Sequence, residues 1–260
     1  MTRTARQASS TGYYHIIMRG DNRNRIFQKK QYKLDFMEML EEQENEGTIE
    51  MAAWCIMDNH VHLVLKAELD QLSLAMKKIN VKFAMRYNLN EKMVGHVFQD
   101  RFKSQAIETD QYLLQVIRYV HNNPVKARIA ETPGNYKWSS YSKYINNETA
   151  GKRRQFEFVL GLFCNNIDEF KAFHMVKDDN EYLEIKEDIE RFREEKAQEI
   201  IGECCAKHGI IEAYQIKENE RVMNDLIVEL IDKSGMSYRK IARLLEISYN
   251  TVREVGRNKH

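Results

Sequence analysis

The sequence predicts an α+β protein: a ferredoxin-like antiparallel sheet with packed helices, followed by an all-α C-terminal extension that ends in a helix-turn-helix. Three observations predict this class. Runs of β-forming residues alternate with amphipathic segments in the order β-α-β-β-α-β-α up to about residue 144. Residues 146–154 are polar and are typical of a linker. The chain beyond this linker is acidic and mostly follows a helical pattern.

The individual elements follow from local patterns. Strands are expected over residues 13–18, 49–57 and 60–66 and in the outer parts of 97–108. Helices are expected over residues 30–46, 72–87 and 110–123. Gly47 ends the first of these helices, whereas Asp110 caps the third and Pro124 stops it.

Charge is distributed unevenly along the chain. Residues 1–155 hold 24 Lys and Arg against 17 Asp and Glu, a net of +7. Residues 156–229 hold 9 against 19, a net of −10, and residues 230–260 hold 7 against 3, a net of +4. Two basic blocks favour a polyanionic partner such as nucleic acid, although ordinary surface charge also explains a surplus of this size. The expected domains are 1–145, 146–221 and 222–260.

Export and membrane insertion are not expected. No apolar run approaches the roughly 20 residues that span a bilayer, and residues 1–12 are polar, unlike a signal peptide. The four cysteines lack the spacing of a disulfide framework. We therefore expect a cytoplasmic protein with reduced thiols and no membrane partner.

The triplet His60-Val61-His62 is the most informative short motif. Because side chains alternate along a strand, His60 and His62 point the same way, about 7 Å apart. Val61 and Leu63 point to the opposite, buried face. Two imidazoles on a rigid strand can bind one divalent metal ion. By itself, the motif favours a pair of half-exposed strand histidines.

The helix expected over residues 110–123 carries a tyrosine and an amide on one edge. Its buried stripe follows helical spacing and consists of Leu113, Val116, Ile117 and Val120. Tyr119 lies at the edge of this stripe, and Asn123 shares its face one turn later. A phenolate beside a sheet-bound metal can attack a phosphate, and the Asn123 carbonyl is a candidate third ligand. A boundary tyrosine and a helix-terminal asparagine are the alternative interpretation.

Five segments occur in a defined order over about residues 10–145. They are Tyr14-His15-Ile16 with Arg19-Gly20, and residues 57–64 (MDNHVHLV), 98–104 (FQDRFKS), 118–127 (RYVHNNPVKA) and 138–141 (WSSY). With them the chain resembles the single-tyrosine HUH transposases, and among these the REP-associated tyrosine transposases. Each segment alone is weak evidence, but the set in this order is highly specific.

The resemblance implies that residues 1–145 form the catalytic domain of a transposase that cleaves and rejoins single-stranded or hairpin DNA. It implies that His60 and His62 bind Mg²⁺ or Mn²⁺ and that Tyr119 becomes linked to a 5′-phosphate. Asn123 falls where many relatives carry Gln or another polar ligand. The implied phosphate contacts are Arg19, Arg23, Arg101 and Lys103, although solvated surface charge is an alternative for Lys103.

Residues 222–260 resemble a DNA-binding helix-turn-helix module. Helices are expected over residues 222–233, 238–245 and 249–256. Ser237 caps the second helix, Ala242 takes the small position between helices, and Glu246 stands where Gly is common. The residues that would contact DNA are Tyr249, Asn250 and Arg253. A plain helical hairpin is the alternative.

Two other functions stay open. One is a non-catalytic DNA-binding regulator derived from such a transposase, and the other is a metal-dependent phosphoesterase acting on RNA, which needs no tyrosine. The presence of His60, His62 and Tyr119 together favours the cleaving enzyme. Tyr112 is the competing nucleophile, because it lies two turns before Tyr119 on the same face. The sequence fits either a monomer or a homodimer.

Overall fold

The computed structural model describes residues 6–146, 153–176, 182–183, 186–210, 216 and 219–257. Most of the expected linker therefore lies outside the described residues. The chain divides into two compact units, Met1–Leu183 and Glu184–His260.

A four-stranded antiparallel sheet forms the centre of the first unit. Its strands are β1 (Tyr13–Arg19), β2 (Glu50–Ile56), β3 (His60–Lys66) and β4 (Lys103–Ile107). They lie in the order β2-β3-β1-β4, so β1 and β3 are central and β2 and β4 are edge strands. The predicted α+β class with an antiparallel sheet and packed helices is confirmed.

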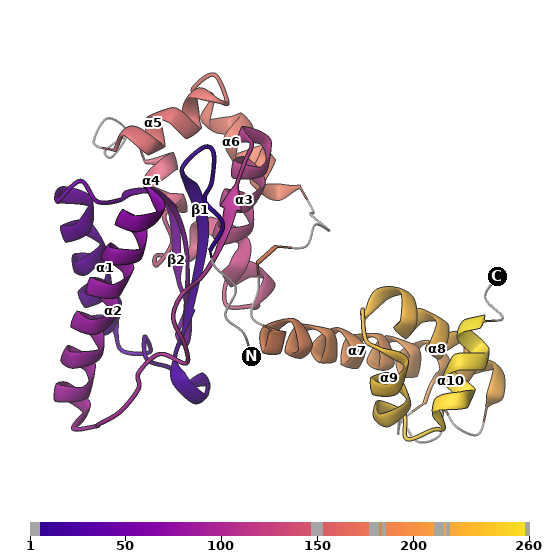
Figure 1. Cartoon of the computed structure of the whole chain (residues 1–260). Helices are drawn as coiled ribbons and strands as arrows, with labels where there is room; N and C mark the ends of the chain where they lie inside the picture. The colour runs from indigo at the N-terminus through magenta and orange to yellow at the C-terminus, as the bar shows by residue number, and fades with distance from the viewer. Residues whose placement is uncertain are drawn as a thin grey trace. The chain divides into compact units, whose positions relative to one another are not determined.

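Helices cover both faces of this sheet. The helices α1 (Lys30–Asn45) and α2 (Leu69–Glu91) pack on one face, and α3 (Asp110–Lys126) packs on the other (Figure 1). Strands β1 and β3 consequently bury nearly all of their residues. His60 and His62 are buried with the rest of β3, which excludes a half-exposed pair.

Two glycines are required by the backbone in this unit. Gly47 follows α1 with a φ of +72°, a left-handed conformation that ends the helix as expected. Gly20 follows β1, and a Cβ at this position would lie 2.3 Å from the carbonyl oxygen of Asn24. The tight turn after β1, which contains the 3₁₀ helix η1 (Asp21–Arg23), therefore needs a residue without a side chain at position 20.

The predicted start of α3 at Asp110 is confirmed, but its predicted N-cap and its predicted C-terminal end are wrong. Thr109 is the N-cap, since its side-chain oxygen accepts a hydrogen bond from the Tyr112 N–H at 3.1 Å. Pro124 lies inside the last turn, and the helix continues to Lys126. A proline there removes one backbone donor, while the Ala127 N–H still bonds to the Asn123 carbonyl at 3.0 Å. Asn123 is therefore a residue within the helix rather than its terminus.

The segment 97–108 forms less strand than expected. Only its C-terminal part is the edge strand β4, and Phe98 makes an isolated bridge with Gly20. Backbone hydrogen bonds hold the segment around Phe98 at the end of β1. The Gln99 N–H donates to the Arg19 carbonyl at 3.0 Å.

The first unit extends beyond the boundary expected at residue 145. The 3₁₀ helix η2 (Pro133–Asn135) leads to α4 (Tyr141–Ile145), α5 (Arg154–Gly161) and α6 (Ile167–Met175), and these three helices gather at one end of the sheet (Figure 1). Phe156 and Phe170 are fully buried in the same core as the strands. These aromatic side chains hold α5 and α6 on the sheet domain, so residues 153–176 do not form a separate extension.

The second unit is helical. It contains α7 (Lys186–His208), α8 (Glu220–Lys233), α9 (Tyr238–Leu244) and α10 (Tyr249–Arg257). The last three lie where helices were predicted. Ala197 and Ile200 of α7 are buried with Leu226 of α8, so α7 shares one core with the three helices after residue 221. The expected boundary at 221/222 therefore divides this core. Among the described residues, no helix is long and apolar enough to cross a membrane.

Candidate active site

His60 and His62 point from β3 toward the amide of Asn123 on α3. The Nε2 atom of His60 lies 3.4 Å from the Asn123 Oδ1, and the Nε2 atom of His62 lies 3.1 Å from the Asn123 Nδ2. The two imidazole rings are 5.0 Å apart between centroids and nearly perpendicular. The structure thus brings together the three residues that the sequence singled out as metal ligands.

The other ring nitrogens of both histidines have partners that fix their tautomers. The His60 Nδ1–H donates to the Asn59 Oδ1 at 2.7 Å, and the His62 Nδ1–H donates to the His15 Nε2 at 3.2 Å. Burial lowers the pKa of His15 to about 3, so this imidazole stays neutral and can accept. Both Nε2 atoms then present lone pairs toward Asn123.

This arrangement fits a bound cation. With its proton on Nδ1, His60 directs the Nε2 lone pair at the Asn123 carbonyl oxygen, so two acceptors face each other. Rotating the amide by half a turn moves the same conflict to His62. A divalent cation removes it by accepting both lone pairs. In the described part of the chain no cluster of three His, Cys, Asp or Glu side chains could hold a metal, and the candidate third donor beside the two histidines is the Asn123 amide.

Tyr119 lies beside the histidines and is 4% exposed. Its ring meets the His62 ring edge-on at 5.4 Å and the His15 ring at 5.6 Å. The Nζ of Lys126, two turns later on α3, lies 4.6 Å from its ring centroid. A cation in this position would favour the ionised, phenolate form of Tyr119. Tyr112 stacks instead on Tyr182, at 6.3 Å.

Three residues of this site received no role from the sequence. His15 and Lys126 belong to segments that carry the family resemblance. Their presence in these segments is the sequence feature that could have indicated a role in the site. Tyr182 follows α6 and stacks on Tyr119 with ring centroids 4.5 Å apart. It is buried, and no sequence pattern around it indicates a contact with α3.

The basic candidates divide into two groups. Arg19 pairs with His60 in the register of β1 and β3, and Lys103 pairs with Ile17, which itself pairs with His62. Paired residues share a face of the sheet, so Arg19 and Lys103 lie on the histidine face. Exposed Arg23 and Arg101 lie in the turns around the end of β1. The structure therefore places Arg19 and Lys103 on the histidine face, and Arg23 and Arg101 near the end of β1.

The second unit presents the other three candidates. Tyr249, Asn250 and Arg253 are exposed on α10, while Val252 is buried between the helices. The guanidinium of Arg239 on α9 lies 6.0 Å from the Tyr249 ring. Glu246 has a φ of +51° in the turn before α10, where a glycine would have less strain.

A buried polar chain fixes the opposite side of α3. The Ser140 hydroxyl donates to the His121 Nε2 at 2.7 Å, and the His121 Nδ1–H donates to the His174 Nε2 at 2.8 Å. The His174 Nδ1–H donates in turn to the Phe170 carbonyl at 2.8 Å. Each imidazole acts once as donor and once as acceptor, which requires both to be neutral. The chain anchors α3 to α6 and thereby fixes the direction of Tyr119 and Asn123.

The buried hydrogen-bonded pair of His121 and His174 makes the stability of the first unit pH-dependent. Burial lowers the pKa of His174 from 6.5 to about 4 and that of His121 well below its usual range. The unfolded chain therefore binds these protons more readily, and stability is present above pH 6.5 and lost as the pH falls toward 4. For His174 alone the shift corresponds to about 3 kcal/mol.

Urea unfolding of the wild type should show that the free energy of unfolding falls between pH 7 and pH 4.5. The same measurement on His174→Gln should show a smaller fall. Equal pH dependence in both proteins would assign the acid sensitivity to other groups.

The comparisons with known proteins agree with this geometry. Residues 8–123 match the family model for IS200-like transposases. A solved structure of a REP-associated tyrosine transposase bound to a REP hairpin aligns with a TM-score of 0.51 and 14% identity, over 70% of this chain and 95% of that chain. At this identity the likeness establishes the fold. A putative transposase from Deinococcus radiodurans R1 aligns with a TM-score of 0.32 and 16% identity, over 47% of this chain and 95% of that chain, which is too weak to establish a common fold. No curated protein gives a significant match.

The matched residues include both strand histidines, Tyr119 and Asn123, which the fold brings to one place. Residues 8–123 therefore resemble the IS200-like transposases, and the chain shares its fold with the solved REP-associated tyrosine transposase.

Proposed function

We propose that this protein cleaves and rejoins single-stranded or hairpin DNA through a 5′-phosphotyrosine formed on Tyr119. The contact between the Tyr119 and His62 rings carries this proposal, because the candidate nucleophile lies beside the candidate metal ligands. His60, His62 and the Asn123 amide hold the divalent ion, Mg²⁺ or Mn²⁺. When bound, such an ion polarises the scissile phosphate and neutralises its charge.

The reaction is balanced without an external reagent. The Tyr119 phenol oxygen attacks the phosphorus, the bond to the 3′ oxygen breaks, and the phenol proton leaves with the freed 3′-OH. The energy of the phosphodiester is kept in the phosphotyrosine. Attack by a 3′-OH then rejoins a strand and regenerates the phenol. Lys126 stabilises the charge that develops at the tyrosine oxygen during both steps.

The choice of DNA substrate rests on the basic candidates and on the family. Arg19 and Lys103 lie on the histidine face, where they would contact phosphates on either side of the scissile bond. The solved transposase with the same fold was bound to a REP hairpin. A non-catalytic regulator would not need Tyr119 beside the histidines, and a phosphoesterase acting on RNA would not need the tyrosine.

Covalent attachment of protein to DNA separates these three functions. The purified protein is incubated with Mn²⁺ and a labelled hairpin oligonucleotide that has single-stranded flanks. The candidate hairpins are those that border its gene. We expect a labelled species that survives denaturing electrophoresis and that disappears after protease treatment. Cleavage without such a species would support the phosphoesterase, and binding without cleavage would support the regulator.

We further propose that the second unit binds duplex DNA through α10. Tyr249, Asn250 and Arg253 are exposed on one short helix, as in the recognition helix of a helix-turn-helix. Each phosphate contact contributes about 0.9 to the slope of log affinity against log salt on duplex DNA. Arg253→Ala should therefore weaken duplex binding and flatten its salt dependence, while cleavage of a short single strand persists.

Arg221→Ala is the matched control, because it removes an exposed arginine from α8 of the same unit. Binding isotherms at several salt concentrations provide the measurement. If both variants keep the wild-type salt slope, α10 does not contact this DNA and the unit is a plain helical bundle.

A further inference from the structure

A cavity of about 870 Å³ lies between α1 and the chain that follows α3. Its size is within the range of small-molecule sites. Trp54 of β2 contributes to it, and Trp54 pairs with Leu63, whose side chain points away from the histidine face. The cavity therefore belongs to the α1 side of the sheet, whereas Tyr119 and the metal ligands belong to the α3 side.

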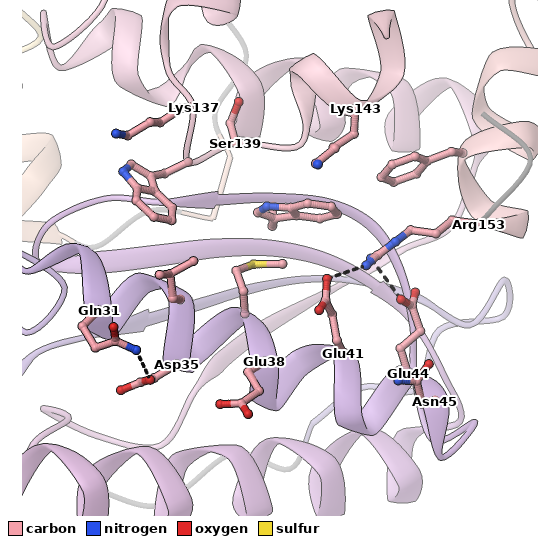
Figure 2. A pocket seen from close by; sticks show the side chains of 15 residues that line it. Gln31, Asp35, Glu38, Glu41, Glu44, Asn45, Lys137, Ser139, Lys143 and Arg153 are labelled. Atoms are coloured by element: carbon pink, nitrogen blue, oxygen red, sulfur yellow. Dashed lines mark hydrogen bonds and ion pairs between the residues drawn. The ribbon is translucent and has the colours of Figure 1, made fainter. Parts of the chain in front are cut away.

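The wall formed by α1 is acidic. Figure 2 shows Asp35, Glu38, Glu41 and Glu44 along this helix. Each of two arginines bridges two carboxylates: Arg86 lies 3.1 Å from Asp35 and 2.9 Å from Glu38, and Arg153 lies 3.0 Å from both Glu41 and Glu44. One guanidinium cannot neutralise two carboxylates, so this wall keeps acceptor oxygens and a net negative charge.

The opposite wall is basic. Lys137 and Lys143 lie across the cavity from α1 (Figure 2), and both side chains belong to exposed residues. The Nζ of Lys137 lies 5.5 Å from the ring centroid of Trp138. A ligand that bridges the two walls must therefore place an anionic group near the lysines and hydrogen-bond donors near α1.

Flat aromatic surface separates the two walls. Trp138 is partly exposed, and the Lys137 ammonium lies over its ring. Trp54 is 5% exposed and stacks on Phe156 with ring centroids 5.8 Å apart, which makes it part of the floor. Such a surface favours a planar ligand, since bases stack on aromatic side chains with about 1–3 kcal/mol each.

We propose that this cavity binds one unpaired nucleotide whose base carries an exocyclic amino group. The phosphate contacts Lys137 and Lys143, and the base stacks on Trp138. The amino group and a neighbouring ring N–H donate to the carboxylates of α1. Guanine suits this wall best, because its amino group and its adjacent ring N–H are both donors, whereas thymine has no amino group.

The two tryptophans allow a direct test, because they are the only ones in the chain and both line the cavity. The full-length protein is titrated with dGMP, dTMP or inorganic phosphate while tryptophan fluorescence is recorded. We expect saturable quenching by dGMP, affinity for dTMP lower by about tenfold or more, and no quenching by phosphate. Equal affinity for dTMP and dGMP, quenching by phosphate alone, or no response to dGMP would overturn the proposal.

Matched variants link the signal to the lysines. The double variant Lys137→Ala, Lys143→Ala should weaken dGMP binding by about tenfold or more, since both side chains are exposed and their loss leaves the core intact. Lys171→Ala removes an exposed lysine from α6 and should bind dGMP as the wild type does. If all variants bind alike, the lysines do not hold the phosphate and the proposal fails.

A final arm identifies the source of the nucleotide, and only this arm rests on the proposed function. Hairpin oligonucleotides with an unpaired guanine or an abasic site are added to Tyr119→Phe. If the guanine hairpin quenches fluorescence and competes with dGMP, the nucleotide belongs to the DNA substrate. If dGMP alone quenches, the ligand is a free nucleotide of the same chemistry. Failure of DNA cleavage would leave the dGMP titration unaffected.

Discussion

Tyr119→Phe is expected to abolish the covalent protein–DNA species, with cleavage lowered by at least about a thousandfold, while DNA affinity stays within about twofold. The substitution removes only the phenolic oxygen. The ring that packs against His62, His15 and Tyr182 remains, so the fold of α3 and the metal ligands are preserved. Denaturing gels report the adduct, and an equilibrium binding assay reports the affinity.

Tyr112→Phe is the matched control, because it removes the same atom two turns earlier on the same helix. Tyr112 stacks on Tyr182 rather than on a histidine, so this variant should still form the adduct. An adduct that persists in Tyr119→Phe and is lost in Tyr112→Phe would reverse the assignment of the nucleophile.

The second large effect is expected at the proposed metal ligands. His60→Ala and His62→Ala should each lower cleavage by at least about a hundredfold, since changes to residues that only support a ligand already cost 10–100-fold. Chelation of the wild type should have the same effect, and added Mn²⁺ should reverse it. Folding should survive in both variants, because the apolar residues of β3, such as Leu63 and Val64, still form the core.

Two substitutions of Asn123 separate its proposed role as a metal ligand from its role in packing. Asn123→Asp keeps the size and supplies a stronger oxygen donor, so metal binding should persist, whereas Asn123→Leu should lose it. Circular dichroism and isothermal titration with Mn²⁺ distinguish loss of binding from loss of fold. Undiminished cleavage by His62→Ala, or by the wild type in excess chelator, would remove the metal from the mechanism.

Local patterns predicted most of the sheet domain because each element there is bounded by its own signals. Gly47 ends α1, and the two strands beside Asp58-Asn59 have strong β-forming residues. The ends of α3 could not be read in the same way. Asp110 and Thr109 are both good caps, and a proline near the end of a helix does not reveal whether it follows the last turn or lies within it.

The domain boundaries failed for a different reason. Acidic composition after residue 155 indicated a separate extension, but the contacts that decide a boundary are made by a few apolar residues. Phe156 and Phe170 join the sheet domain, and Ile200 joins the helical unit. Tyr182 was missed likewise, because its contact with Tyr119 joins positions far apart in the sequence.

The boundary between Leu183 and Glu184 offers a site for protein engineering. No buried cluster of the described residues contains members from both sides of it, so a fusion made there cuts through neither hydrophobic core. All the proposed catalytic side chains precede it. A chimera that replaces residues 184–260 with another DNA-binding module would therefore keep the proposed catalytic residues intact. It would bind the DNA sequence that the new module recognises.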